Sequence, residues 1–285
     1  MTEFPLPGMG RAVVAVPAPG AGPGYWAGAS CAVLDGDEVV LAYRVRNGHD
    51  GVDQNVIARS PDGERFETVA VLDQDRFGAQ WVERPALVRT PAGRWRLWVC
   101  CGSPRTKSWW IDVLEADDLA GLATAEIRRA FPGDALNAVK DPLIRYAGGR
   151  YHAWICCHLL DIPGAEDRMN SAYATSEDGW DWTWHGTVLE GRPGHWDARG
   201  ARITAVLPDG RAAYDGRATA EENWFERTAL AEPTPTGTFT ALPTSPVIDA
   251  RYLDVLPLPT GDHRIYYEAR LPDESHELRT ELILA

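Results

Sequence analysis

Short runs of hydrophobic residues, separated by turns that contain glycine, recur along the chain. The segment from Gly93 to Cys101 aligns with the segment from Gly149 to Cys157, 56 residues later, and five of the nine positions are identical. Such short runs, rich in Trp, Tyr, Val and Ile and bounded by turns, predict paired antiparallel β-strands. The alignment indicates that one structural unit occurs more than once.

The same pattern of a β-like run, a glycine turn, a second run and a third run occurs five times. The turn glycines lie 51 to 61 residues apart and are Gly36, Gly93, Gly149, Gly210 and Gly261. Five successive antiparallel sheets predict an all-β fold, a five-bladed β-propeller that occupies residues 1–285 as a single domain. We expect a strand at residues 11–16 to complete the last blade and close the ring. The alternative is a β-sandwich, but the regular spacing is too long for its single strands.

Two local features add detail to this prediction. Ser60-x-Asp62 and Ser176-x-Asp178 are each followed by glycine and then by an aromatic residue, which predicts turns closed by the Ser and Asp side chains. Residues 116–129, rich in Ala, Leu, Asp and Glu, are expected to form a helical or irregular insertion.

Composition and charge restrict the possible partners. The 12 Trp, 27 Gly and 21 Pro agree with strands and turns rather than long helices. The net charge of −13 opposes binding to nucleic acid and to anionic membranes, so neither is expected as a partner. Five cysteines, including two adjacent pairs, do not indicate a disulfide framework, and no signal sequence is recognised, so a cytoplasmic location is expected. No cofactor or metal site is predicted.

The geometry of a propeller selects the candidate functional residues. The innermost strand of each blade starts at one face of the central channel, and the second strand ends at the same face. Charged side chains are rare inside sheets unless they are paired, so their repeated occurrence at these ends predicts a polar funnel. The alternative is that Arg–carboxylate pairs tie neighbouring blades together. The candidates are Trp26, Arg44, Glu83, Arg84, Asp141, His158, Arg202, Asp215, Arg217, Asp254, Glu268 and Arg270.

Three motifs resemble those of known enzymes. The start Lys140-Asp141-Pro142, the turn Gly149-Arg150-Tyr151 and the closing segment from Ser176 to Trp182 resemble blades of the five-bladed propeller glycoside hydrolases, families 43, 32, 62, 68 and 130. The resemblance implies a set of three carboxylates at the starts of inner strands. Asp141 matches the Asp of the Asp-Pro motif, which implies a role in transition-state stabilisation or pKa control.

The sequence departs from these families at two positions. Repeat one has no Asp in the stretch from Tyr25 to Ser30, and repeat four has no Glu at the start of its inner strand. The carboxylates available as substitutes are Glu83, Asp215, Asp254 and Glu268.

Glycoside hydrolysis requires one carboxylic acid and a second carboxylate that acts as base or nucleophile. We expect Glu83 or Glu268 to be the acid and Asp141 or Asp215 to be the partner. Tryptophans could stack on sugar rings, and arginines could bind substrate oxygens, a carboxylate or a phosphate. The tryptophans are Trp26, Trp81, Trp110 and Trp196, and the arginines are Arg202, Arg217 and Arg270.

Three functions remain open from the sequence. The first is a glycoside hydrolase-like enzyme acting on a small carbohydrate, with phosphorolysis as a variant because family 130 includes phosphorylases. The second is an enzyme of specialised metabolism that uses the same funnel for cyclisation or rearrangement of a small molecule. The third is a non-catalytic carbohydrate-binding protein. The oligomeric state is not predicted.

Overall fold

A computed structural model describes residues 3–48, 51–103 and 108–285. Almost all of the regular structure is antiparallel β-sheet, with two short 3-10 turns, η1 (Gln74–Phe77) and η2 (Ala120–Ala123). The prediction of an all-β fold is confirmed. The insertion expected at residues 116–129 contains η2 and then enters strand β9.

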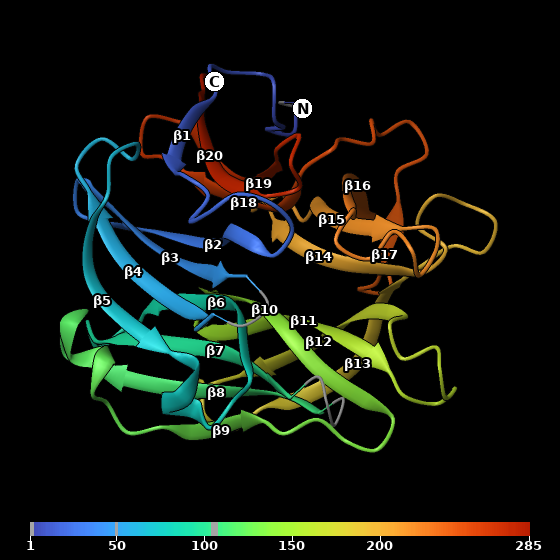
Figure 1. The fold of residues 1–285 in the computed structure, drawn as a ribbon, viewed down its shortest axis with the longest axis horizontal. Coiled ribbons are helices and arrows are strands. Elements are labelled where there is room, and N and C mark those ends of the chain that lie inside the picture. Colours follow the sequence, from blue (N-terminus) through green and yellow to red (C-terminus); the bar gives the residue numbers. More distant parts are fainter. Residues whose placement is uncertain (1–2, 49–50, 104–107) are drawn as a thin grey trace.

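Within the described residues, consecutive strands pair antiparallel in five groups (Figure 1). The first group is β2 (Tyr25–Asp35), β3 (Glu38–Asn47), β4 (Gln54–Ser60) and β5 (Glu67–Asp73), and the second is β6 (Trp81–Arg89), β7 (Trp95–Ser103), β8 (Ser108–Ala116) and β9 (Arg128–Phe131). The third is β10 (Asn137–Ala147), β11 (Arg150–Leu159), β12 (Met169–Ser176) and β13 (Thr183–Glu190). The fourth is β14 (Gly200–Val206), β15 (Ala212–Arg217), β16 (Arg227–Pro233) and β17 (Phe239–Ala241).

The fifth group joins both ends of the described chain. It contains β18 (Arg251–Pro257), β19 (His263–Arg270) and β20 (His276–Ile283), and β1 (Val13–Val16) pairs antiparallel with β20. The strand expected at residues 11–16 is therefore present and lies in the last sheet. Single parallel bridges, Trp26 with His276 and Met169 with Gly200, connect neighbouring groups.

The first strands of the groups lie side by side at the middle of the molecule (Figure 1). β2 lies against β6 and β18, β10 lies against β6 and β14, and β14 also lies against β18. Each of these five strands is almost fully buried over most of its length.

Each first strand also has an irregularity in its pairing with the second strand. The register shifts between Gly28 and Cys31, Val82 and Pro85, Lys140 and Leu143, Ile203 and Ala205, and Arg251 and Asp254. A bulge of this kind inserts an unpaired residue and turns its side chain away from the regular alternation. Three of the bulged residues have the left-handed backbone that non-glycine residues seldom adopt: Ala29 (φ 52°), Asp141 (φ 48°) and Tyr252 (φ 51°).

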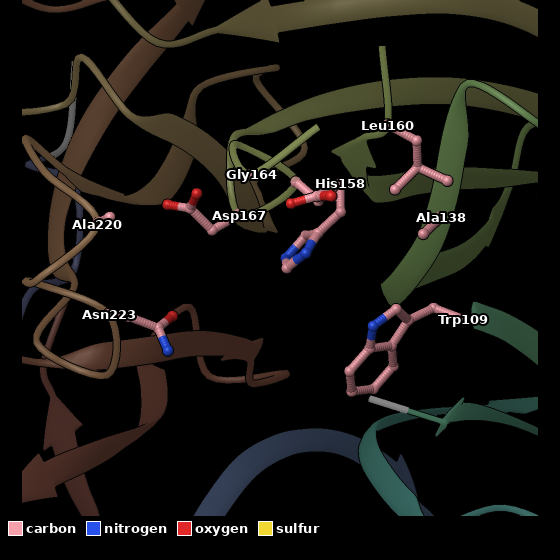
Figure 2. A pocket seen from close by; sticks show the side chains of 9 residues that line it. Trp109, Ala138, His158, Leu160, Gly164, Asp167, Ala220 and Asn223 are labelled. Carbon is pink, nitrogen blue, oxygen red and sulfur yellow. The ribbon is translucent and has the colours of Figure 1, made fainter. Parts of the chain in front are cut away.

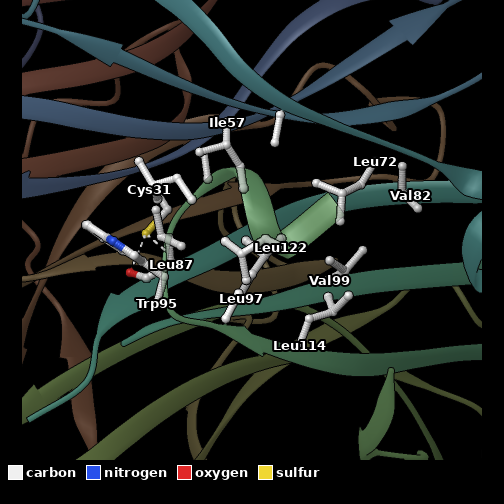
Figure 3. Close-up of a cluster of buried hydrophobic side chains, with 14 of the residues drawn as sticks. Cys31, Ile57, Leu72, Val82, Leu87, Trp95, Leu97, Val99, Leu114 and Leu122 are labelled. Carbon is white, nitrogen blue, oxygen red and sulfur yellow. Dashed lines mark hydrogen bonds between the residues drawn. The ribbon is translucent and has the colours of Figure 1, made fainter. Parts of the chain in front are cut away.

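The hydrophobic core lies between neighbouring groups. Ile57 and Leu72 of the first group pack with Val82, Leu97 and other residues of the second, and Leu122 of η2 closes the cluster (Figure 3). A second cluster places Trp98 of β7 against aromatic residues of the third group, with ring centroids 6.1 Å from Tyr151 and 6.3 Å from Trp182.

The smaller predictions for turns and cysteines are confirmed. Asp178 accepts backbone hydrogen bonds from Trp180 and Asp181 at 2.8 and 3.0 Å, and Asp62 does the same in the matching turn. All five cysteines are buried free thiols.

Trp98→Ala tests the packing between the second and third groups. Because the indole is fully buried, we expect the free energy of unfolding to fall by about 3–5 kcal/mol, measured by urea denaturation. Trp184→Ala is the control, since Trp184 is 44% exposed, and it should cost less than about 1 kcal/mol. Similar losses for both variants would contradict this account of the core.

Candidate active site

A small polar cavity of about 30 Å³ lies where the first strands meet. Its walls come from all five strand groups and from the loop after β15, and most of the side chains are charged. The lining residues with charged or polar side chains are Arg44, Arg46, Glu83, Lys140, His158, Arg202, Arg217, Asn223, Glu226, Arg251 and Tyr252. The other lining residues are Trp26, Met169 and Trp224. The predicted gathering of polar residues at the strand ends is thus present.

Buried ion pairs form a continuous chain on one side of the cavity. Arg46 of β3 contacts Asp53 at 3.0 Å and Glu83 of β6 at 2.7 Å. Arg44, two residues earlier on β3, contacts the other oxygen of Glu83 and also Glu268 of β19 at 2.7 Å. Three strand groups are therefore tied together by alternating charges.

The same chain continues on the other side of the cavity. Arg251 of β18 contacts Glu268 at 3.1 Å and Glu226 at 3.0 Å. Arg217 of β15 then contacts Glu226 at 2.5 Å and Asp167, in the loop before β12, at 3.4 Å. We call the whole series, from Asp53 to Asp167, the ion-pair chain. It reaches all five strand groups.

A separate cluster surrounds Asp141 at the bulge of β10. Arg202 of β14 bridges Asp141 at 3.0 Å and Asp215 at 2.8 Å. The Tyr252 hydroxyl donates to Asp141 at 3.2 Å, and the Lys140 ammonium lies 3.8 Å from the same carboxylate. These contacts all involve Oδ2, whereas Oδ1 is buried and has no hydrogen-bond partner within the described residues.

Electrostatics hold the three glutamates of the ion-pair chain in the ionised form, whereas burial raises the pKa of Asp53 at its end. Burial alone would raise the pKa of Glu83, but Arg46, Lys140 and Arg44 outweigh it and hold the pKa well below its usual range. Burial alone would also raise the pKa of Glu226. Arg251, Arg202 and Arg217 outweigh burial and lower this pKa to about 2. The pKa of Glu268 is also lowered, because Arg44 and Arg251 outweigh burial.

Two other groups near the cavity shift toward the neutral form. Burial raises the pKa of Asp215, although Arg202 opposes the shift. Burial, with Lys140 and Arg217 adding to it, lowers the pKa of His158 well below its ordinary value. His158 therefore carries a neutral imidazole at neutral pH.

A wider pocket of about 450 Å³ opens beside the small cavity (Figure 2). It shares His158 and Asn223 with the cavity, so the two form a funnel with a narrow inner end. Figure 2 shows Ala220 and Asn223 across the pocket from Trp109 and Ala138, with His158 between the two sides. The remaining lining residues are Leu160, Gly164, Glu166 and Asp167. A pocket of this size can hold a small ligand.

The structure brings most of the predicted site residues together. Trp26, Arg44, Glu83, His158, Arg202 and Arg217 line the small cavity. Asp141, Asp215 and Glu268 lie directly behind them, in contact with lining arginines and almost fully buried.

Three predicted residues lie elsewhere, which corrects their expected placement. Arg84 donates to the backbone oxygens of Ser30 and Thr204, and Asp254 accepts from the backbone of Ala32 at 2.6 Å, so both tie strands together. The bulges direct these side chains into strand contacts instead of the cavity. Arg270 lies outside the cavity lining and pairs with Asp249 at 2.8 Å.

The pKa directions oppose one predicted role. Glu83 and Glu268 were expected to act as the acid, but a general acid needs a raised pKa and both pKa values are lowered. Among the tryptophans, Trp26 stacks on His276 with centroids 5.0 Å apart, whereas Trp196 packs against Tyr214.

Sequence reasoning missed Glu226 and Asp167. Both come from loops that precede the third strand of their group, and the rule based on first-strand starts and second-strand ends does not reach them. Their signal is position: a loop that leaves the second strand begins at the funnel face, so its acidic residues can meet the arginines there.

The missing Asp of repeat one has a structural counterpart. Ala29 occupies the bulge of β2 with the same left-handed backbone as Asp141. At the preceding residue, Gly28, a Cβ atom would overlap the carboxylate of Glu268. Glu268 thus fills the space beside the repeat-one bulge from the neighbouring strand group.

Within residues 3–48, 51–103 and 108–285, no cluster of three or more His, Cys, Asp or Glu side chains is arranged to hold a metal ion. The same part of the chain contains no helix of the length and hydrophobicity needed to cross a membrane.

Comparisons with known proteins reveal similarity in structure only. No family model matches the chain. No curated protein matches it in sequence either. Among solved structures, a thermostable family-43 glycoside hydrolase superposes with a TM-score of 0.66 at 14% identity, over 90% of this chain and 88% of that one. The fold is that of glycoside-active enzymes.

Two further structures show the same similarity. β-1,2-Mannobiose phosphorylase from Listeria innocua, in complex with β-1,2-mannobiose, has a TM-score of 0.63 at 14% identity, over 99% of this chain and 93% of that one. A third structure superposes with a TM-score of 0.65 at 14% identity, over 98% of this chain and 95% of that one. It belongs to the GH130 family of mannoside phosphorylases, which contains glycoside hydrolases that target β-1,2-mannosidic linkages in Candida mannan. The resemblance noted in the motifs is confirmed at the level of the fold.

Glu226→Gln tests the ion-pair chain through its pH dependence. A pKa lowered from 4.5 to about 2 contributes roughly 3 kcal/mol of stability at pH 7, a contribution that is lost as the pH falls from about 5 to 2. We expect the variant to be less stable than the wild type at pH 7 and the difference to shrink toward pH 3. Urea denaturation across this range measures both.

The control for this experiment is Glu177→Gln, which changes an exposed glutamate outside the ion-pair chain. Its stability should follow that of the wild type at every pH. A Glu226→Gln deficit that stays constant from pH 7 to pH 3 would show that the carboxylate is not held ionised by its neighbours.

Proposed function

We propose that the chain forms a single domain, a five-bladed β-propeller. Two observations support this. The five strand groups follow one another in sequence, and their first strands contact in a closed order, β2–β6–β10–β14–β18 and back to β2. β1, paired with β20, supplies the outer strand of the fifth blade.

We propose further that the protein is an enzyme that acts on a glycoside bound in the funnel. The observation that carries this proposal is the set of carboxylates, arginines and a neutral histidine gathered at the meeting point of the first strands, with a sugar-sized pocket beside it. The similarity of the fold to glycoside hydrolases and phosphorylases supports the same reading.

In this proposal, Asp141 acts from directly behind the wall of the small cavity. Its backbone strain and its unpaired Oδ1 favour a functional role, because strained residues and unsatisfied buried atoms concentrate at active sites. Through Oδ2 it would hold in position Arg202, Tyr252 and Lys140, which line the cavity. Glu83, ionised and on the cavity wall, would act as the nucleophile, because its lowered pKa makes it a weak base.

A non-catalytic carbohydrate-binding protein is the second candidate. It is favoured by the fact that the carboxylates lining the small cavity, Glu83 and Glu226, both have lowered pKa values and arginine partners. Neither is therefore prepared to donate a proton to a leaving group.

A screen separates the two candidates. Purified protein is incubated with 4-nitrophenyl glycosides of the common hexoses and pentoses, and with disaccharides, in the presence and absence of inorganic phosphate. Turnover identifies an enzyme, and dependence on phosphate identifies a phosphorylase. Calorimetric binding of the same sugars without turnover would identify a binding protein.

Asp141→Asn tests the assignment of this residue. Asn tolerates the left-handed backbone, so the variant should remain folded by circular dichroism, while kcat on the best substrate should fall by roughly 10²–10⁴-fold. Asp178→Asn, which changes an exposed turn residue, should retain wild-type kcat. Near-normal turnover by Asp141→Asn would remove Asp141 from the mechanism.

A further inference from the structure

One segment of the wall of the small cavity differs from the rest. Of the fourteen described residues that line the cavity, eleven lie in β-strands, whereas Asn223, Trp224 and Glu226 lie between β15 and β16. Glu226 is buried and belongs to the ion-pair chain. By contrast, none of residues 218–225 is buried. The loop 218–225 is therefore the part of this wall that is free to move without breaking a sheet.

Local hydrogen bonds shape the 218–225 loop. The Glu222 carboxylate accepts from the backbone N–H of Ala218 at 2.7 Å and lies 3.5 Å from the Arg227 guanidinium. The backbone oxygen of Glu222 accepts from the N–H of Phe225 at 2.8 Å. A segment bonded in this way keeps its own turns when it is displaced, so it can shift as one unit relative to the sheets.

Contacts with the first and fifth strand groups hold the loop in its observed position. The Trp224 indole packs edge-on against Trp26 of β2, with ring centroids 5.2 Å apart. The backbone oxygen of Trp224 accepts from Arg251 at 3.3 Å. At the end of the loop, Phe225 lies 4.5 Å from the guanidinium of Arg270. Breaking these contacts would release the loop from the neighbouring groups and leave the strands intact.

The backbone of Trp224 opposes the observed position. Its φ is 76°, in the left-handed region that bulky residues seldom adopt. Such strain persists only where the surrounding contacts impose it, and it is concentrated in functional and switching segments. Strain thus favours release of the loop, whereas packing against Trp26 favours the observed position. Opposing preferences of this kind are what a two-position element requires.

The proposed function requires the small cavity to open. Its volume of about 30 Å³ has room for about one water molecule and not for a sugar ring. Glu83, the proposed nucleophile, lies on its wall. A glycoside can therefore contact Glu83 only if part of the wall moves. Ala220 and Asn223 of the 218–225 loop also line the wide pocket, so a shift of this loop changes both spaces (Figure 2).

We propose that the 218–225 loop is a gate over the small cavity, which opens to let a glycoside reach Glu83 and then closes around the bound sugar. This inference rests on the proposed function. Trp224 is the residue that closes the gate, and Arg270, which lies outside the cavity, holds its end through Phe225. Closure of a loop over a bound substrate excludes water from the reaction.

A tether between the loop and β19 tests this proposal. In the double variant Phe225→Cys/Arg270→Cys, a bismaleimide that contains a disulfide bond fixes the loop in its observed position. The five natural cysteines are buried, so the reagent reacts at the two introduced thiols. The matched control is the same variant capped with N-ethylmaleimide, which adds similar groups without a tether. For both, kcat/KM is measured on the best glycoside of the screen, before and after reduction of the linker.

We expect the tether to lower kcat/KM at least about tenfold relative to the capped control, and reduction to restore it, because a fixed loop keeps the cavity closed. Equal kcat/KM with and without the tether would overturn the gate while the proposed function stands. Absence of turnover in the wild type would instead overturn the catalytic proposal. For a protein that binds sugars without turnover, calorimetry replaces kinetics, and the tether should weaken the affinity by the same factor.

Hydrogen exchange tests the motion of the loop without any ligand. We expect the backbone N–H groups of residues 218–225 to exchange at least about tenfold faster than those of β15 and β16, measured by mass spectrometry. Trp224→Ala should accelerate this exchange further, because it removes the contact with Trp26. Trp184→Ala, which changes an exposed tryptophan outside the loop, should not. Exchange of the loop as slow as that of the flanking strands would contradict the gate.

Discussion

The structure depends on the alternation of buried charges from Asp53 to Asp167. Each arginine of the ion-pair chain contacts two carboxylates, and Glu83, Glu226 and Glu268 each contact two arginines. Removing a charge from water is costly, and the cost is offset only when every partner is present. The strand groups that supply these residues must therefore assemble together, because any group left out would expose an unpaired charge in the interior.

The same alternation determines what chemistry the funnel can perform. Arginines on both sides keep the lining carboxylates ionised, whereas burial, together with the nearby cations, makes His158 neutral. The centre thus presents acceptors whose charge is fixed over a wide pH range. Asp141 differs from the members of the ion-pair chain because one of its buried oxygens has no hydrogen-bond partner among the described residues.

Much of the fold could be predicted from the sequence because the strands and turns depend on residues close together in the chain. Turn glycines such as Gly93 and Gly149, both with positive φ, mark the hairpins, and the aligned Trp98 and Trp154 mark equivalent strand positions. Strand ends likewise predicted the cavity residues Arg44, Glu83 and Arg202. These predictions needed only the order of the strands.

The remainder depended on details that a pattern cannot supply. A one-residue bulge decides whether a side chain on a first strand faces the cavity or a neighbouring strand, and this is why Arg84 and Asp254 were misplaced while Glu83 was not. Glu226 and Asp167 reach the centre only through the paths of long loops. The lowered pKa values that oppose an acid role for Glu83 or Glu268 have a third cause, since a pKa depends on neighbours from other strand groups that sequence spacing does not reveal.

The pairing of β1 with β20 has a consequence for biosynthesis. β1 is translated before the strands of the other four groups, and its partner strand is made only after them. Until then β1 has no sheet to join and is itself an unpaired strand that could pair with another chain. The entropy cost of closing a loop rises only slowly with the length of the loop, so this arrangement has little effect on final stability. Its main effect is to lengthen the time for which an unpaired, aggregation-prone strand is exposed.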